Sequence, residues 1–243
     1  MTKSTKIEKA KSKEVAVFDP TSSFNPADNL EGTTPRLPKI SIVHAGQIFK
    51  VGVEEKKEAA LSGVIIDSNR VNAYWSNSFT DSGGGDPPDC SSRDAMRPDG
   101  GENAQAETCM ACPQNKFGSD GRRGKACKNM RRIHFLVDGN FLPLRLTITS
   151  SSLRAFDDYM MTLVEKQLPK HFARTELSLS EAQNKDGISY SQVQFKLIEP
   201  ITDSNEAGKI VKMKDELVAQ MRGEEIETEE YIAKKDDSKS DPF

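Results

Sequence analysis

The most specific chemical pattern in this sequence is formed by its cysteines. The chain contains four of them, with the spacing C-x18-C-x2-C-x14-C: Cys90, Cys109, Cys112 and Cys127. Two thiolates two residues apart can bind a tetrahedral metal ion from a single turn, and the outer two would complete the ligand set. Because a closed site of four cysteines leaves no open position for a reactant, the spacing predicts a structural zinc ion.

Other interpretations of the cysteines stay open. Four thiolates also ligate iron–sulfur clusters, a CxxC pair can serve redox exchange, and cysteines in a polar loop can be free thiols. His134 is a nitrogen donor that could replace Cys90. The motifs of zinc deaminases and metalloproteases are absent, as are a P-loop and a GxSxG motif. Asp157 and Asp158, the nearest candidates for a nuclease carboxylate pair, are explained by their place early in a helix. We therefore expect no enzymatic activity.

The cysteines lie in or at the edge of a long polar stretch. Residues 76–128 are dominated by Gly, Pro, Asp and Ser and contain hardly any aliphatic side chains. A structureless loop of this length is uncommon inside a compact domain unless something organises it. Metal binding would supply that organisation, because its free energy becomes local folding free energy. We predict a zinc-binding insertion here.

The segments around this insertion carry strand and helix patterns. Five segments have the period of strands or are rich in β-branched and aromatic residues: 40–53, 61–75, 131–149 (a hairpin turning at Asp138-Gly139-Asn140), 174–182 and 188–200. Apolar stripes at helical spacing predict helices in 151–169 and 205–221. This order predicts a mainly β protein with added helices: an OB-fold-like five-stranded barrel with a four-cysteine zinc insertion and a C-terminal helix. An α+β sandwich of another topology is the alternative.

Composition divides the chain into four regions. Hydrophobic residues make up 35% and charged residues 29%, so a packed core cannot run the full length. Residues 1–38 are polar and rich in lysine and proline, which predicts a flexible arm. Residues 39–203 would form the OB-like nucleic-acid-binding domain and 204–223 the C-terminal helix. Residues 224–243 hold eight acidic residues against three lysines, a net charge of −5, and predict a disordered acidic tail.

The sequence shows no membrane or export signal. No apolar run approaches the length that spans a bilayer, and the first residues lack the apolar region of a signal peptide. Four cysteines in a reducing compartment also favour metal binding over disulfides. We therefore expect a cytoplasmic protein.

A basic and aromatic stretch surrounds the last two cysteines. Between Cys109 and Phe135 there are seven Lys or Arg residues against one Asp, a local net charge of +6. Cations can follow a phosphate backbone, and aromatic faces stack unpaired bases at about 1–3 kcal/mol each. Aromatic and cationic residues in the strand segments 61–75 and 188–200 are further candidates. The predicted contacts to single-stranded DNA are Tyr74, Trp75, Lys116, Phe117, Arg122, Arg123, Lys125, Lys128, Arg131, Arg132, Tyr190 and Lys196.

The final residues, DDSKSDPF, resemble the C-terminal tip of bacterial single-stranded DNA-binding proteins, whose acidic tails end in Asp, a residue or two and Pro-Phe. In that family the tip docks into basic, hydrophobic pockets on replication and repair enzymes. The resemblance implies that Asp241, Pro242 and Phe243 dock partners, with Asp236 and Asp237 as electrostatic support. It covers about the last ten residues, and the cysteine-rich insertion departs from the bacterial family. That insertion is similar to the zinc-bearing single-stranded DNA-binding proteins of some phages.

These features predict a single-stranded DNA-binding protein of a phage or mobile element, acting in the bacterial host cell. It would coat and protect DNA and recruit replication, recombination or repair proteins through its tip. A close variant would also anneal complementary strands. The acidic tail would compete with phosphate for the basic surface, so its deletion should tighten DNA binding. The alternative is a zinc-ribbon RNA-binding or transcription-associated protein.

Overall fold

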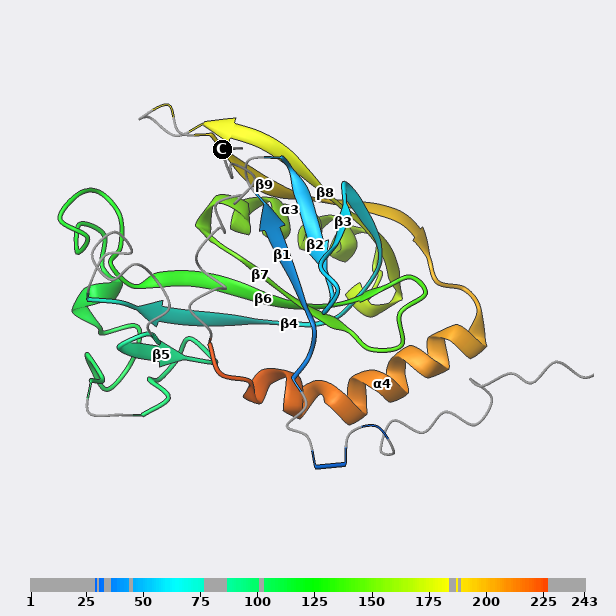
Figure 1. Cartoon of the computed structure of the whole chain (residues 1–243), viewed down its shortest axis with the longest axis horizontal. Coiled ribbons are helices and arrows are strands. Elements are labelled where there is room, and N and C mark those ends of the chain that lie inside the picture. Colours follow the sequence, from blue (N-terminus) through cyan, green and yellow to red (C-terminus); the bar gives the residue numbers. More distant parts are fainter. Residues whose placement is uncertain are drawn as a thin grey trace, which may run out of the picture. The chain divides into compact units, whose positions relative to one another are not determined.

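The computed structural model describes residues 29, 31–32, 36–43, 46–76, 87–100, 103–183, 187 and 189–226. The chain divides by its internal contacts into two units, Met1–Pro35 and Arg36–Phe243. All strands and helices named below belong to the second unit, and Figure 1 shows their arrangement. Within the described residues, no helix has the length and apolar character needed to cross a lipid bilayer.

The centre of the second unit is one nine-stranded sheet that curls into a half-barrel. Its strands are β1 (Lys39–Val43), β2 (Ile48–Val51), β3 (Lys56–Glu58), β4 (Ala60–Tyr74), β5 (Cys90–Ser92), β6 (Lys128–Val137), β7 (Leu144–Ile148), β8 (Ala173–Gln183) and β9 (Ser189–Pro200). The order across the sheet is β3-β2-β1-β7-β6-β4-β8-β9, and β5 pairs with the end of β4. Among the strand pairs that the structure describes, only β1–β7 is parallel.

One helix covers each face of the sheet. Helix α3 (Ser150–Glu165) packs its buried Phe156 against Ile65 and other core residues, whereas α4 (Ser204–Gly223) packs against Val64 and Ile66. Neighbouring residues of a strand point to opposite faces, so β4 contributes to both cores. Figure 1 shows α3 above the sheet and α4 along the opposite side of β4.

Strands β4 and β6 approach each other closely at one glycine. A Cβ atom on Gly63 would clash with the carbonyl oxygen of Leu136. Only glycine fits this position without a backbone shift. Further along the pair, a bulge between Ile65 and Asp67 changes which residues of β4 face α4.

The predicted mainly β class and both predicted helices are confirmed. The hairpin at Asp138-Gly139-Asn140 forms β6 and β7 as expected. The segment 40–53, however, forms two antiparallel strands, β1 and β2, instead of one. The five-stranded OB-like barrel is not confirmed, because the pairing joins nine strands in the order given above.

The predicted N-terminal arm ends earlier than composition suggested. Leu37 is buried in the cluster between β4 and α4, and the carbonyl of Pro38 accepts a hydrogen bond of 2.9 Å from the Arg145 N–H. Residues 36–38 are therefore part of the fold, since they bury apolar surface and join the hydrogen bonds of the sheet.

Candidate nucleic-acid interface

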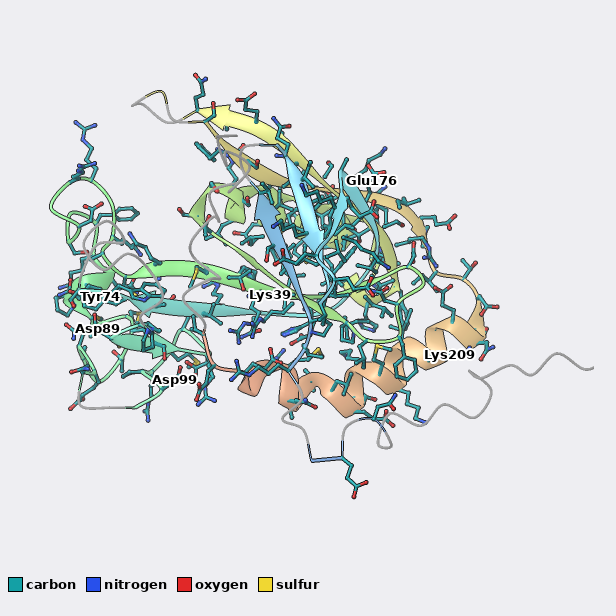
Figure 2. All side chains as sticks on the ribbon, viewed as in Figure 1. Lys39, Tyr74, Asp89, Asp99, Glu176 and Lys209 are labelled. Atoms are coloured by element: carbon teal, nitrogen blue, oxygen red, sulfur yellow. The ribbon has the colours of Figure 1, made fainter. Side chains whose placement is uncertain are left out.

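The end of β4 positions two of the four cysteines. Cys90 opens β5 and pairs with Tyr74 on one side of β4. Lys128, the residue after Cys127, pairs with Ala73 on the other side. Figure 2 labels Tyr74 at this end of the sheet, together with Asp89 of the insertion. The outer cysteines are thus brought to the same end of the sheet although the whole insertion separates them in sequence.

Backbone hydrogen bonds connect the other two cysteines to this place. The N–H of Cys109 donates to the carbonyl of Met96 at 2.9 Å, and the Asn115 side chain donates to the carbonyl of Cys109 at 2.8 Å. The N–H of Cys127 donates to the carbonyl of Gln114, also at 2.8 Å. These bonds tie the CMAC turn to the loop after β5 and to the start of β6.

The four thiols influence one another electrostatically. Burial raises the pKa of Cys127 to about 12, and the charges of the other three thiols would add to this shift. Burial also raises the pKa of Cys90, whereas a hydrogen bond from the Gln105 N–H opposes the rise and the nearby Cys109 and Cys112 add to it. Such couplings require that the sulfur atoms lie near one another.

The donor set of this cysteine cluster suits zinc. Four thiols, three of them buried, are gathered at one end of the sheet, and a bound cation would reverse the rise in their pKa values. Among the described residues, however, no three His, Cys, Asp or Glu side chains are placed as ligands of one ion. Zinc therefore stays a prediction. His134 does not replace Cys90, because β6 places it opposite Asp67 and Arg145, further along the strand.

Residues 113–126, here called the basic loop, present an exposed ring among cations. Phe117 is 81% exposed. Lys116, Arg122 and Arg123 of the same loop are exposed as well. An aromatic face free to stack on a base, with cations beside it for the phosphates, is the combination with which proteins bind single-stranded nucleic acid.

Lys125 connects the basic loop to the sheet. Its ammonium lies 5.0 Å from the centre of the Phe117 ring, within reach of a cation–π contact. The same ammonium donates to the side-chain oxygens of Asn115 and Asn129, each at 3.1 Å. Lys125 therefore contacts both the exposed ring of Phe117 and Asn129 on β6.

A pocket of about 270 Å³ lies beside the basic loop, on the face of the sheet that α3 covers. The register places Arg70 opposite Arg131 and Asn72 opposite Asn129. Residues directly opposite each other share a face of the sheet, so all four side chains reach the same side. The pocket is lined by Arg70, Asn72, Ala95, Asn115, Lys125, Asn129, Met130, Arg131, Leu153 and Asp157.

Arg131 contacts both an aromatic ring and a carboxylate beside this pocket. Its guanidinium lies 4.8 Å from the centre of the Phe156 ring and donates to Asp157 at 3.2 Å. Burial lowers the pKa of Arg131, Asp157 raises it, and the nearby charge of Arg70 lowers it again. Two arginines directly opposite each other on a sheet repel.

Two of the predicted contacts face the other side of the sheet. Arg132 has no exposed surface, and its guanidinium donates to the carbonyls of Glu224 and Glu225 at 2.7 and 2.9 Å. Arg132 therefore offers no exposed surface for the predicted contact with DNA, because Glu224 and Glu225, which follow α4, cover its guanidinium. Trp75 is partly buried and packs against the apolar cluster that includes Val71 and Ile226.

The remaining predicted contacts do not line the pocket. Tyr74 and Lys128 are half-buried at the end of β4 and the start of β6. Tyr190 and Lys196 lie on β9, which β8 separates from β4 in the sheet. Lys196 forms a long ion pair of 3.9 Å with Glu176. Of the predicted contacts, the structure brings together those of the basic loop and Arg131.

A cluster of charges surrounds the buried Asp67 on the α4 face. Asp67 accepts hydrogen bonds from Arg222 at 2.7 and 3.0 Å and from Lys170 at 3.4 Å. Burial alone would raise the pKa of Asp67, but the hydrogen bond from Arg222 and the charges of Lys170 and Arg222 lower it to about 2. These contacts hold the last turn of α4 against β4.

The start of the acidic tail is held by the same face. The carboxylate of Glu224 pairs with Arg145 at 2.9 Å and accepts from the Leu37 N–H at 3.1 Å. Ile226 is buried beside Trp75. The predicted docking residues Asp236, Asp237, Asp241, Pro242 and Phe243 lie outside the described residues.

Sequence reasoning missed four polar residues of the pocket, namely Arg70, Asn72, Asn115 and Asn129. A signal for two of them existed: Arg70 and Asn72 are polar residues at strand period that alternate with the apolar Val71 and Ala73. Their cross-strand partners depend on the register of β4 with β6, which no local pattern provides.

Comparisons with known proteins do not decide between the functions that these sites allow. No protein-family model, no curated protein and no solved structure matches the chain.

Proposed function

We propose that this is a non-enzymatic protein that binds and coats single-stranded DNA. The observation that carries the proposal is the exposed Phe117 ring, which stands among the cations of the basic loop and shares Lys125 with a pocket lined by Arg70 and Arg131. The ring supplies a stacking surface and the cations supply contacts to the backbone.

The exposed ring favours unpaired over paired DNA as the ligand. A base can stack on an aromatic side chain only if its own face is free, and in a duplex both faces are covered by neighbouring base pairs. Stacking is also tolerant of sequence, because every base has an aromatic face. A protein that coats strands of any sequence needs this tolerance.

Zinc has a structural role in this proposal. Bound by Cys90, Cys109, Cys112 and Cys127, it would stabilise the thiolate forms and add its binding free energy to the folding of the insertion. The chain's own contribution is to bury three of these thiols and to carry the basic loop between the third and fourth cysteine. The metal would thereby keep Phe117 and its cations in place.

The acidic tail is the proposed recruiting element. By the resemblance described above, Asp241, Pro242 and Phe243 would dock replication, recombination or repair enzymes, supported by Asp236 and Asp237. Ile226 packs beside Val71, Ala73 and Met130 near the end of β4, so the tail starts at the end of the sheet that carries the basic loop. From this start the tail can compete with phosphate for the cations.

The proposal is tested by the fluorescence anisotropy of a labelled poly-dT oligonucleotide at two salt concentrations, with duplex DNA and single-stranded RNA as competitors. We expect salt-sensitive binding that duplex competes poorly. Phe117→Ala should lower the affinity by about 1–3 kcal/mol. The matched control is Phe141→Ala, since Phe141 is 60% exposed in the loop between β6 and β7. Preferential binding of RNA would favour the RNA-binding alternative, and preferential binding of duplex would contradict both.

A further inference from the structure

The pocket beside the basic loop holds more positive charge than the chain neutralises. Arg70, Lys125 and Arg131 line it against a single carboxylate, Asp157. Asp157 is 59% exposed and pairs with Arg131 alone. Among the described residues, Arg70 forms no ion pair. The lining therefore carries a net charge of about +2, which a folded protein without a ligand has no reason to concentrate in one hollow.

The positions of the two arginines favour an anion bound between them. Arg70 and Arg131 stand directly opposite each other on β4 and β6, where like charges destabilise a sheet. Within the described part of the chain, the Nε–H of Arg131 is buried and has no hydrogen-bond partner. A buried donor without a partner destabilises the fold, so an acceptor that reaches it would be bound favourably.

The remaining polar groups of the pocket are donors or are already in use. Asn129 donates to the side-chain oxygen of Asn72 at 2.8 Å and accepts from Lys125, and Asn115 also accepts from Lys125. The amides hold Lys125 in the pocket and leave its positive charge unneutralised. The pocket therefore offers cations and N–H donors to a small anion with several acceptor oxygens, which is the chemistry of a phosphate group.

We propose that this pocket binds one backbone phosphate of the DNA strand, clamped between Arg70 and Arg131 with Lys125 as the third cation. The inference rests on the function proposed above and names the position at which the strand crosses the sheet. Because Lys125 also lies against the Phe117 ring, the phosphate in the pocket belongs to a nucleotide next to the base that stacks on Phe117. The strand thus runs from the basic loop onto the α3 face.

The test compares variants that remove a positive or a negative charge from the pocket and should change the affinity for DNA in opposite directions. Arg70→Gln removes one contact to the strand, and its loss should lower the affinity for poly-dT about eightfold at about 50 mM salt. The slope of log affinity against log salt should become shallower by about 0.7. Asp157→Asn removes the carboxylate and should instead raise the affinity. Arg131→Gln should behave like Arg70→Gln, with thermal unfolding measured to confirm that it folds.

Lys212→Gln is the matched control. It removes the same unit of charge from α4, on the other face of the sheet, where Lys212 is 75% exposed. We expect it to change the affinity less than about twofold. If Arg70→Gln and Lys212→Gln have equal effects while the wild-type protein binds poly-dT, the phosphate clamp is wrong and the proposed function survives. If the wild-type protein does not bind poly-dT, the proposed function and the clamp both fail.

A calorimetric titration with inorganic phosphate in the absence of DNA separates the two sources of a phosphate. A strand phosphate requires weak or undetectable binding of free phosphate together with the loss of DNA affinity in Arg70→Gln. Binding of free phosphate that Arg70→Gln abolishes, with unchanged DNA affinity, would overturn the assignment to the strand.

Discussion

Arg131 and Arg132 are neighbours on β6 and face opposite sides of the sheet. The two guanidinium groups differ in the acceptors that surround them. On the α4 face, Arg132 is fully buried and donates to two backbone carbonyls at the end of α4. On the α3 face, Arg131 reaches one exposed carboxylate and stands opposite another arginine. The first guanidinium is held by acceptors of the chain itself, whereas the second leaves room for an anion. At this end of the sheet, the α4 face therefore satisfies its arginine with groups of the chain, whereas the α3 face leaves Arg131 beside a pocket.

The comparison is tested most strongly by removing each arginine in turn. Arg132→Ala should lower the free energy of unfolding by about 3 kcal/mol or more, because it leaves buried carbonyls unpaired and creates a cavity. Arg131→Ala should cost about 1 kcal/mol, since its ion pair is to an exposed carboxylate. Urea unfolding followed by circular dichroism measures both. Equal losses of unfolding free energy in the two variants would contradict the proposed difference between the α4 face and the α3 face.

Acid should lower the stability of the fold because it protonates His134, which lies on the α4 face. The side chain is fully buried, and burial together with the charges of Arg132 and Arg145 lowers its pKa to about 4. The unfolded chain binds the proton near pH 6.5 and the folded chain does not. The neutral histidine therefore makes its full contribution to the free energy of unfolding above about pH 7. This free energy falls by about 3 kcal/mol as the pH drops to about 4. In His134→Gln this part of the pH dependence should vanish, and an unchanged profile would contradict the assignment.

Asp67 should contribute a second loss at lower pH. Its pKa of about 2 lies below the ordinary value, so the paired carboxylate stabilises the fold above about pH 4. The contribution, about 2 kcal/mol, should disappear as the pH falls from about 5 to 2. The control is Asp157→Asn on the α3 face, which should leave this part of the profile unaltered because Asp157 is largely exposed. Unfolding free energies at several pH values distinguish the two carboxylates.

Removal of the proposed zinc ion should have the smallest effect on the sheet and a selective effect on binding. A strong chelator, or Cys112→Ser, should expose the basic loop to proteases and weaken poly-dT binding, while the thermal unfolding of the sheet changes little. Metal analysis by mass spectrometry should find about one zinc per chain in the wild-type protein. A metal-free protein whose basic loop still resists proteases would contradict the structural role of zinc. An iron signal would indicate an iron–sulfur cluster in its place.

Much of the secondary structure could be predicted because it depends on neighbouring residues. The turn at Asp138-Gly139-Asn140 and the alternation on both sides of it predict β6 and β7 from a few residues each. The stripe containing Phe156 and Leu163 predicts α3 in the same way. The strand pair β1–β2 was missed because Gly46 is the one turn-favouring residue between the two strands, and the positive φ of 51° falls on Gln47 instead.

The candidate site was predictable only in its charged loop. The spacing of the cysteines and the cations between them marked residues 113–126 as functional, and the structure exposes Phe117 there. The pocket was not predictable, because Arg70 and Arg131 meet only through the pairing of two strands that the whole insertion separates in sequence. Register of this kind is set by the burial of entire strands.

The amino-acid sequence alone is enough to predict the local elements, the gathering of charge into a basic loop and an acidic tail, and the opposite orientation of Arg131 and Arg132 on one strand. These follow from the period of a strand and from composition, which act between near neighbours. Which of the two arginines is buried depends on long-range packing. Arg132 is buried because the chain returns to the sheet after α4, where Glu224 and Glu225 supply the carbonyls that it needs, and such a long-range contact forms only when the whole core is packed.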